Sequence, residues 1–210
     1  MVLDEPGATR GDGPDPRLQT PQVVDLAGDL ARYVLHEHPE RIRHTEGVVE
    51  RAKLLTVAVP ADHAPLLVAA AWLHDIGYAQ TLRRTGFHPL DGALALRDLG
   101  WPAEVCTLVA HHSGARYVAA VRDLQDQLEP FSFQQDLLSD AVTVADQTAG
   151  PNGVAMSITE RMDDMLARHG SDSPNAQAHP RRGPYLLSAA ARVATRMQQA
   201  GIAPGRHGIF

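Results

Sequence analysis

The chain has 210 residues, of which 44% are hydrophobic, and a formal net charge of −6 at pH 7. This length suits one domain with additional terminal segments, and the lack of a Lys/Arg block argues against duplex nucleic acid as a partner. The single cysteine, Cys106, excludes intrachain disulfides and thiolate-rich metal sites and is typical of a reducing compartment.

The N-terminal segment, residues 1–19, is acidic and rich in Gly and Pro, and we expect a disordered tail there. It has neither the basic start nor the apolar stretch of a signal peptide. No apolar run approaches the roughly 20 residues that span a bilayer. We therefore expect a cytoplasmic protein with no membrane partner.

Beyond the tail, apolar residues recur at helical spacing and are interrupted at Gly and Pro, with no strand-like alternation and no internal repeat. The sequence therefore predicts an all-α fold, a compact helical bundle over residues 20–150 with a C-terminal helical extension over 151–210. The expected helices span residues 20–38, 40–56, 62–77, 88–99, 102–112, 117–128, 134–148, 157–169 and 184–200.

Local signals set several of these boundaries. Thr20 and Pro21 resemble an N-cap followed by Pro at the first helical position. Gly77 can supply a left-handed C-cap, and Ser157 with Glu160 forms a capping box. Met and Leu side chains at helical spacing in the extension are expected to pack in the core, or alternatively to form a lid or a dimer surface.

The most informative stretch is Leu73-His74-Asp75, which directly follows a segment that is apolar on every side, Leu66–Trp72. Such a segment should lie in the core. A carboxylate at its end must be paired, hydrogen-bonded or bound to metal, because an isolated buried charge is very costly.

Other His and Asp residues end apolar stripes in the same way. His44 shares a helical face with Val48 and Ala52, and Asp146 shares one with Leu138 and Val142, so both should point inward. The remaining histidines are expected at the surface or in the tail: His36, His38, His63, His169, His179 and His207.

The candidate ligands are therefore nitrogen and oxygen donors, and six or seven are too many for one ion that must also bind substrate. They suit two divalent transition-metal ions that share Asp75 as a bridge, with Fe or Mn favoured and Zn, Ni or Co as alternatives. Of the adjacent pair His111 and His112, the spacing slightly favours His111 as the ligand. The candidates are His44, His74, Asp75, His88, His111 or His112, and Asp146.

The ordered set His44, His74-Asp75 and Asp146 resembles the HD superfamily of metal-dependent phosphohydrolases, over about residues 25–150. His74-Asp75-Ile76-Gly77 matches the commonest central motif of that family, and Arg41–Thr45 resembles its first-histidine segment. The segments 88–92 and 111–114 resemble branches whose additional histidines hold a second metal, among them diadenosine-tetraphosphate hydrolases and cyclic-dinucleotide phosphodiesterases.

Departures from the better-known branches leave the substrate open. Ser113 stands where the cyclic-dinucleotide group has Glu, Tyr78 replaces a frequent Lys, and that group's Gly-Tyr-Pro is missing. The Glu-Asp pair of the alarmone hydrolases is also missing from the comparable region.

The resemblance implies that a metal-bound hydroxide attacks a phosphoester or phosphoanhydride of a small substrate, with a nucleotide favoured. Asp75 would bridge the ions, Asp91 is a candidate proton relay to the leaving group, and Arg41, Arg43 and Arg116 are candidate phosphate clamps. The alternatives are a non-catalytic HD module for signalling or binding, and a di-iron oxygenase of the HD type.

Overall fold

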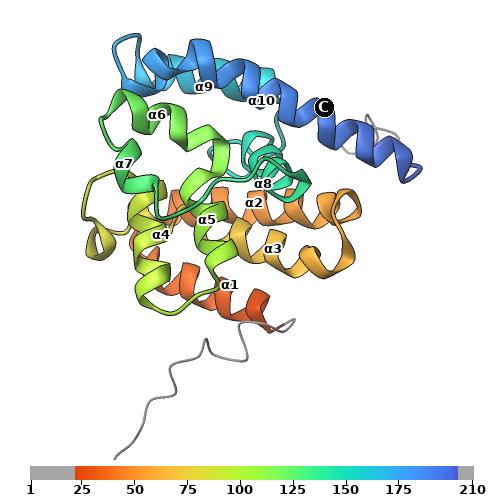
Figure 1. The fold of residues 1–210 in the computed structure, drawn as a ribbon, viewed down its shortest axis with the longest axis horizontal. Coiled ribbons are helices and arrows are strands. Elements are labelled where there is room, and N and C mark those ends of the chain that lie inside the picture. Colours follow the sequence, from red (N-terminus) through yellow and green to blue (C-terminus); the bar gives the residue numbers. More distant parts are fainter. Residues whose placement is uncertain (1–21, 203–210) are drawn as a thin grey trace, which may run out of the picture.

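A computed structural model describes residues 22–202, so the expected tail, the Thr20–Pro21 cap and His207 lie outside the described residues. The prediction of an all-α fold is confirmed, since this range contains helices, one isolated bridge between Ala149 and Ala155, and no strand (Figure 1). The α-helices are α1 (Val23–Val34), α2 (Pro39–Leu55), α3 (Ala64–Leu73), α4 (His88–Asp98), α5 (Ala103–His111), α6 (Ala115–Val121), α7 (Gln125–Leu128), α8 (Leu137–Gln147), α9 (Ile158–His169) and α10 (Pro174–Gln199). Short 3₁₀ turns include η4 (Ile76–Tyr78) and η6 (His112–Gly114).

Helix α3 forms the centre of the bundle. It packs against α1, α2, α5 and α8, and every residue from Leu67 to Leu73 is buried. A helix without a polar face removes its apolar surface from water only when other elements cover it on all sides. This packing places the chain immediately after Leu73, where His74 and Asp75 follow, deep inside the protein.

Gly77 does not act as the predicted left-handed C-cap. The helix ends at Leu73, Gly77 lies inside η4, and its φ is not positive. Its role is a close backbone approach to α4: a β-carbon at this position would clash with the carbonyl oxygen of His88 and would lie 2.6 Å from the backbone nitrogen of Gly92. The glycine therefore lets η4 and the start of α4 come into contact.

Helix α8 has the predicted inward stripe. Asp136 caps its N-terminus in a capping box with Ser139, and Leu138, Val142 and Asp146 are all buried. Because residues four apart share a helical face, the apolar side chains that anchor the helix in the core also direct Asp146 inward.

The C-terminal extension consists of α9 and α10, which lie together along one edge of the molecule, opposite α1 (Figure 1). The predicted capping box of Ser157 and Glu160 is present at the start of α9. Helix α10 begins ten residues before the predicted start, at Pro174, and contains Pro180 and Pro184 in its interior. Interior prolines normally interrupt a helix, but here the helix is held by packing against α6, α8 and α9.

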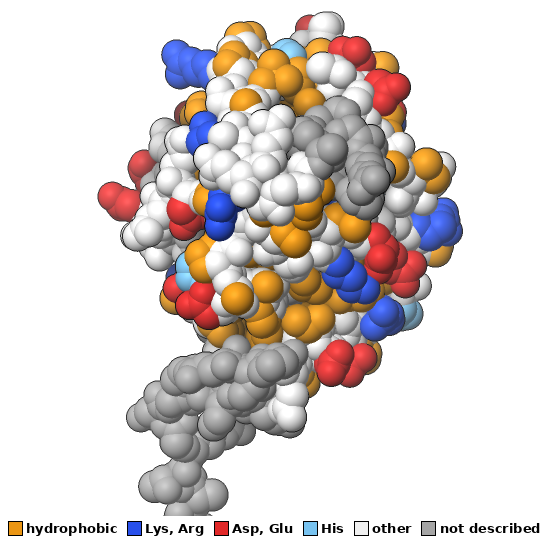
Figure 2. Space-filling view, turned by 90° about the vertical axis from the view of Figure 1, so that its right-hand side faces the viewer, with side chains coloured by type: hydrophobic (Ala, Val, Ile, Leu, Met, Phe, Trp, Pro, Cys, Tyr) orange, Lys and Arg blue, Asp and Glu red, His pale blue; other side chains and the backbone are white. Residues whose placement is uncertain are grey.

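Acidic and basic side chains are interspersed on the face shown in Figure 2. Within residues 22–202, none of the helices combines the length and the apolarity that crossing a bilayer needs.

Candidate metal centre

Six of the predicted ligands come together at one place, although they come from five separate parts of the chain. His44 lies in α2, Asp146 lies in the last turn of α8, and His74 and Asp75 follow α3. His88 begins α4 and His112 begins η6. All are buried except His88, which is partly exposed to the pocket above the cluster.

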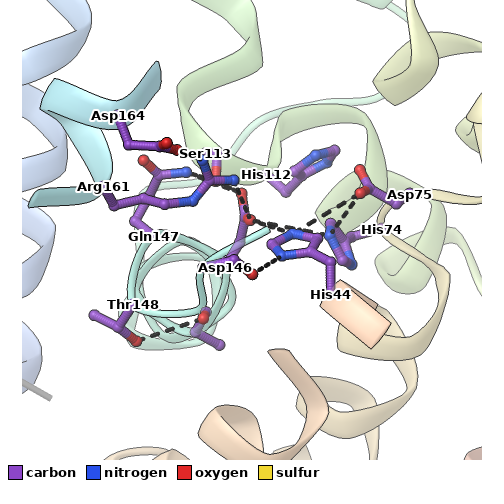
Figure 3. Close-up of polar contacts among 12 residues, drawn as sticks. His44, His74, Asp75, His112, Ser113, Asp146, Gln147, Thr148, Arg161 and Asp164 are labelled. Atoms are coloured by element: carbon purple, nitrogen blue, oxygen red, sulfur yellow. Dashed lines mark hydrogen bonds and ion pairs between the residues drawn. The ribbon is translucent and has the colours of Figure 1, made fainter. Parts of the chain in front are cut away.

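The first group of donors contains His44, His74, Asp75 and Asp146 (Figure 3). The Nε2 atom of His44 lies 3.1 Å from Oδ1 of Asp146 and 3.9 Å from Oδ2 of Asp75. The Nε2 atom of His74 lies 3.4 Å and 4.0 Å from the same two oxygens of Asp75 and Asp146. Two imidazole nitrogens and two carboxylate oxygens thus surround one small volume.

The second group contains Asp75, His88 and His112. The other oxygen of Asp75, Oδ1, lies 3.3 Å from Nε2 of His88, and that nitrogen lies 3.3 Å from Nε2 of His112. Asp75 therefore presents one carboxylate oxygen to each group, which is the arrangement of a bridging ligand.

Backbone carbonyls orient three of the imidazoles. The Nδ1 atom of His44 donates to the carbonyl of Gly150 at 3.0 Å, that of His74 to Ala71 at 2.8 Å, and that of His112 to Val109 at 2.7 Å. A carbonyl only accepts, so each Nδ1 carries a proton and each Nε2 is left facing the cluster, as metal-bound histidines usually are.

The charges of the cluster also call for a cation. Burial opposes ionisation of Asp75 and Asp146, but neighbouring His and Arg side chains outweigh it and hold both pKa values well below the usual range. Burial lowers the pKa of His74, and the two carboxylates reverse this and raise it to about 9. Burial lowers the pKa values of His88 and His112, which keeps these rings in the neutral form that binds metal.

The Nε2 atom of His74 tests whether a metal fits. It is fully buried and has no hydrogen-bond partner, although it faces two ionised carboxylates. A buried polar atom without a partner is costly, and a divalent ion bound among these donors would satisfy it. The donor set, nitrogen and oxygen without sulfur, fits a divalent transition metal.

Two further residues hold the side chain of Asp146 in place. The sequence did not indicate that either of them belongs to the centre. Ser113 adopts the left-handed conformation (φ 53°) and donates its hydroxyl to Oδ2 of Asp146. The side-chain amide of Gln147 donates to the same oxygen and to the Ser113 hydroxyl, both at 3.0 Å. A non-glycine residue in this conformation often marks a functional site, but φ cannot be read from a sequence.

We expect Ser113→Ala to weaken metal binding by about 10- to 100-fold, the usual cost of losing a partner that orients a ligand. Ser113→Gly should weaken it to a similar extent but leave the protein more stable than the alanine variant, because glycine adopts a positive φ without strain. Metal titration and thermal unfolding of the two variants check this. Unchanged metal affinity in both would show that the Ser113 hydroxyl does not position Asp146.

His111 does not join the cluster, so the preference for it over His112 requires correction. Its Nε2 donates to the carbonyl of Phe131 at 2.6 Å, on the side away from the metal ligands. Helix α5 ends at His111, and His112 has already left the helical conformation, with a ψ of 148°. Its ring lies in the cluster, beside His88. Adjacent residues at a helix end face different directions, which spacing alone does not resolve.

Asp91 also differs from its predicted role. It is completely buried and accepts hydrogen bonds from the backbone and hydroxyl of Thr85 and from the backbone of Gly86. Both of its oxygens therefore hold the loop before α4, and Asp91 does not line the pocket. Its structural role replaces the predicted proton relay.

Of the predicted phosphate clamps, Arg41 alone lines the pocket. Its Nη1 donates to Oδ2 of Asp75 at 3.1 Å, and its guanidinium lies over the ring of Tyr78 at 4.4 Å. Arg43 is exposed, and Arg116 lies away from the pocket among aromatic rings, 4.0 Å from the centroid of Phe133. Neither contacts the metal ligands.

The pocket has a wall that the sequence did not predict. Side chains of α9 and α10 line it opposite the metal ligands, among them Arg161, Arg168, His169 and Arg182. His169 is exposed as predicted, and it also stands at the rim of this pocket. This wall could not be predicted, because the local sequence does not show which face of the bundle the extension covers.

Comparison with known protein families matches the part of the chain that contains these ligands. A family model for the HD domain matches residues 41–150, which is more than half of the chain and includes all six clustered ligands. No curated protein and no solved structure matches the chain significantly.

Proposed function

The chain belongs to the HD-domain family, and from this premise we propose that it is a metal-dependent phosphohydrolase. Its substrate is a small phosphorylated compound, and nucleotides are the first class to test. The cofactor is a pair of divalent transition-metal ions, with Fe or Mn favoured over Zn, Ni or Co.

The observation that carries this proposal is the sharing of Asp75 between two donor groups at the base of one pocket. His44, His74 and Asp146 would complete one ion, and His88 and His112 the other. When bound, such a pair supplies an activated water and neutralises charge on phosphoryl oxygens. Two-ion sites of this kind commonly serve phosphoryl chemistry.

The chain itself orients the reactants. Arg41 is fixed by Asp75 and Tyr78 at the edge of the pocket, where its remaining donors can hold a phosphoryl oxygen. The hydroxyl of Ser113 donates to Asp146, but the pKa of this carboxyl is held well below its usual range, so Asp146 is too weak a base to activate the serine as a nucleophile. These features favour direct attack by water over a covalent enzyme intermediate.

The test is metal analysis of the purified protein, followed by phosphate release from a panel of nucleotides and phosphomonoesters. We expect bound transition metal and turnover of at least one compound, both lost in His74→Ala. A folded, metal-free protein that turns over nothing would favour a non-catalytic module, and oxygen uptake with a polyol or phosphonate would favour an oxygenase. Either result would exclude the proposed hydrolase.

A further inference from the structure

The wall contributed by α9 and α10 carries strong positive charge, and it lies outside the residues that match the family model. Arg161, Arg168 and Arg182 all line the pocket. The carboxylates that line it within the described residues, Asp75 and Asp146, both belong to the metal cluster. Two divalent ions would more than neutralise these two carboxylates, and one remaining carboxylate, Asp164, pairs with both Arg161 and Arg168. Three guanidinium groups would then face a single carboxylate.

Arg161 is incompletely paired. Its side chain is only 10% exposed, and its buried Nε has no hydrogen-bond partner. Its Nη1 donates to Asp164 at 3.3 Å, but Asp164 is shared with Arg168, whose Nη2 lies only 2.8 Å away. Its Nη2 is 3.9 Å from Asp146, too far for a hydrogen bond (Figure 3).

Arg182 is also incompletely paired and is more deeply placed. Its Nε donates to the carbonyl of Ser113 at 2.6 Å, while its buried Nη1 has no partner. Burial lowers the pKa of this guanidinium; the charge of Asp146 opposes this effect and that of Arg161 adds to it. A buried guanidinium is normally paired with an anion. No carboxylate of the described residues makes a hydrogen bond or an ion pair with Arg182 in this structure.

The surroundings of His169, at the rim of the same pocket, are also positively charged. The pKa of His169 is lowered, first by burial and then by Arg168, Arg161, Arg41 and Arg182. Four guanidinium groups thus act on one side chain at the pocket rim, and they come from α2, α9 and α10. Guanidinium groups that line a cavity beside a metal cluster, and whose donors are not all used within the protein, are suited to bind an anion.

We propose that Arg161 and Arg182 form a subsite for a second phosphate group of the substrate, next to the phosphate held at the metals. The substrate class is then a compound with a diphosphate or longer polyphosphate chain, rather than a simple phosphomonoester. This inference rests on the proposed hydrolase function for the role of the metal-side phosphate. The anion subsite itself depends only on the two arginines and the pocket.

Calorimetric binding of inorganic pyrophosphate and orthophosphate tests the subsite by a readout other than activity. The wild-type protein should bind pyrophosphate more tightly than orthophosphate. Arg161→Gln should weaken pyrophosphate binding by about 10- to 100-fold, the value of one or two charge-assisted hydrogen bonds, with little effect on orthophosphate. Arg84→Gln is the matched control, because it removes an exposed arginine that pairs with Asp98 and does not line the pocket.

Two further variants keep the outcome decisive. Arg168→Gln alters a 37% exposed side chain and should fold even if Arg161→Gln does not; it should weaken pyrophosphate binding by several-fold. Asp75→Asn, designed to lack the metals, should retain residual pyrophosphate binding that Arg161→Gln then abolishes. This residual binding would persist even if hydrolysis were never found, so the two proposals fail separately.

Equal losses of orthophosphate and pyrophosphate affinity in the arginine variants would show a site for a single free phosphate and would overturn the diphosphate inference. Pyrophosphate affinities that match the Arg84→Gln control would overturn the subsite altogether.

Discussion

Asp75→Asn is expected to remove both metal ions and to abolish metal-dependent activity. Each of the two donor groups contains one oxygen of this carboxylate, so its neutralisation removes a charged ligand from both at once. The loss of activity should exceed 100-fold, since the loss of a group that merely orients a ligand costs about 10- to 100-fold. Elemental analysis should give two ions per wild-type chain and close to none in the variant.

His112→Ala is expected to remove one ion and leave the other. His112 offers its Nε2 to the second group, beside His88, while its ring only packs edge-on against His74 of the first group. The first group therefore keeps its four donors. The adjacent His111→Ala is the matched control: it should retain both ions and lose only stability, because its ring bonds to Phe131. Loss of metal in His111→Ala, or two ions retained in Asp75→Asn, would contradict the shared-carboxylate arrangement.

Much of the centre could be predicted from the sequence because its ligands continue apolar stripes. His44 and Asp146 each share a helical face with core side chains, so the hydrophobic effect that buries the helix also turns the ligand inward. His74 and Asp75 follow a helix that is apolar on every face, and their burial could be predicted from composition alone. In each case, local periodicity sets the tertiary direction.

The rest of the centre depends on backbone geometry and on packing between distant segments. The choice between His111 and His112 depends on where α5 ends, because the helix stops at His111 and His112 is no longer helical (ψ 148°). Helical spacing does not predict the exact end of a helix. The position of Arg182 at the pocket depends on where α10 packs, and that helix contains Pro180 and Pro184, which in a sequence indicate a helix break. Tertiary contacts with α6 and α8 compensate for the lost backbone bonds.

Gly77 shows why a correct motif can be given the wrong physical explanation. The sequence places a glycine after an apolar helix, where a left-handed cap is common. The structure instead uses the missing β-carbon for contact between η4 and α4. The two explanations differ in what they tolerate: a left-handed cap accepts Asn, whereas a close backbone approach accepts no side chain.

Gly77→Ala is therefore expected to destabilise the protein by about 3 kcal/mol, because the β-carbon would meet backbone atoms of α4 that cannot move alone. In a chain of this length, that corresponds to a fall in melting temperature of roughly 6–12 °C. Since the displaced backbone includes His88, the second donor group should also lose affinity for its ion. Thermal unfolding with chelator present, followed by metal titration, measures both effects.

Asn substitutions separate close approach from capping. Gly77→Asn should be at least as damaging as Gly77→Ala, because any β-carbon meets the carbonyl of His88. Gly100→Asn is the matched control: Gly100 has a φ of +77° and no atom within 4 Å of an added β-carbon, so Asn should cost no more than about 1 kcal/mol there. A Gly77→Asn variant as stable as Gly100→Asn would restore the capping role and remove the link between Gly77 and the position of His88.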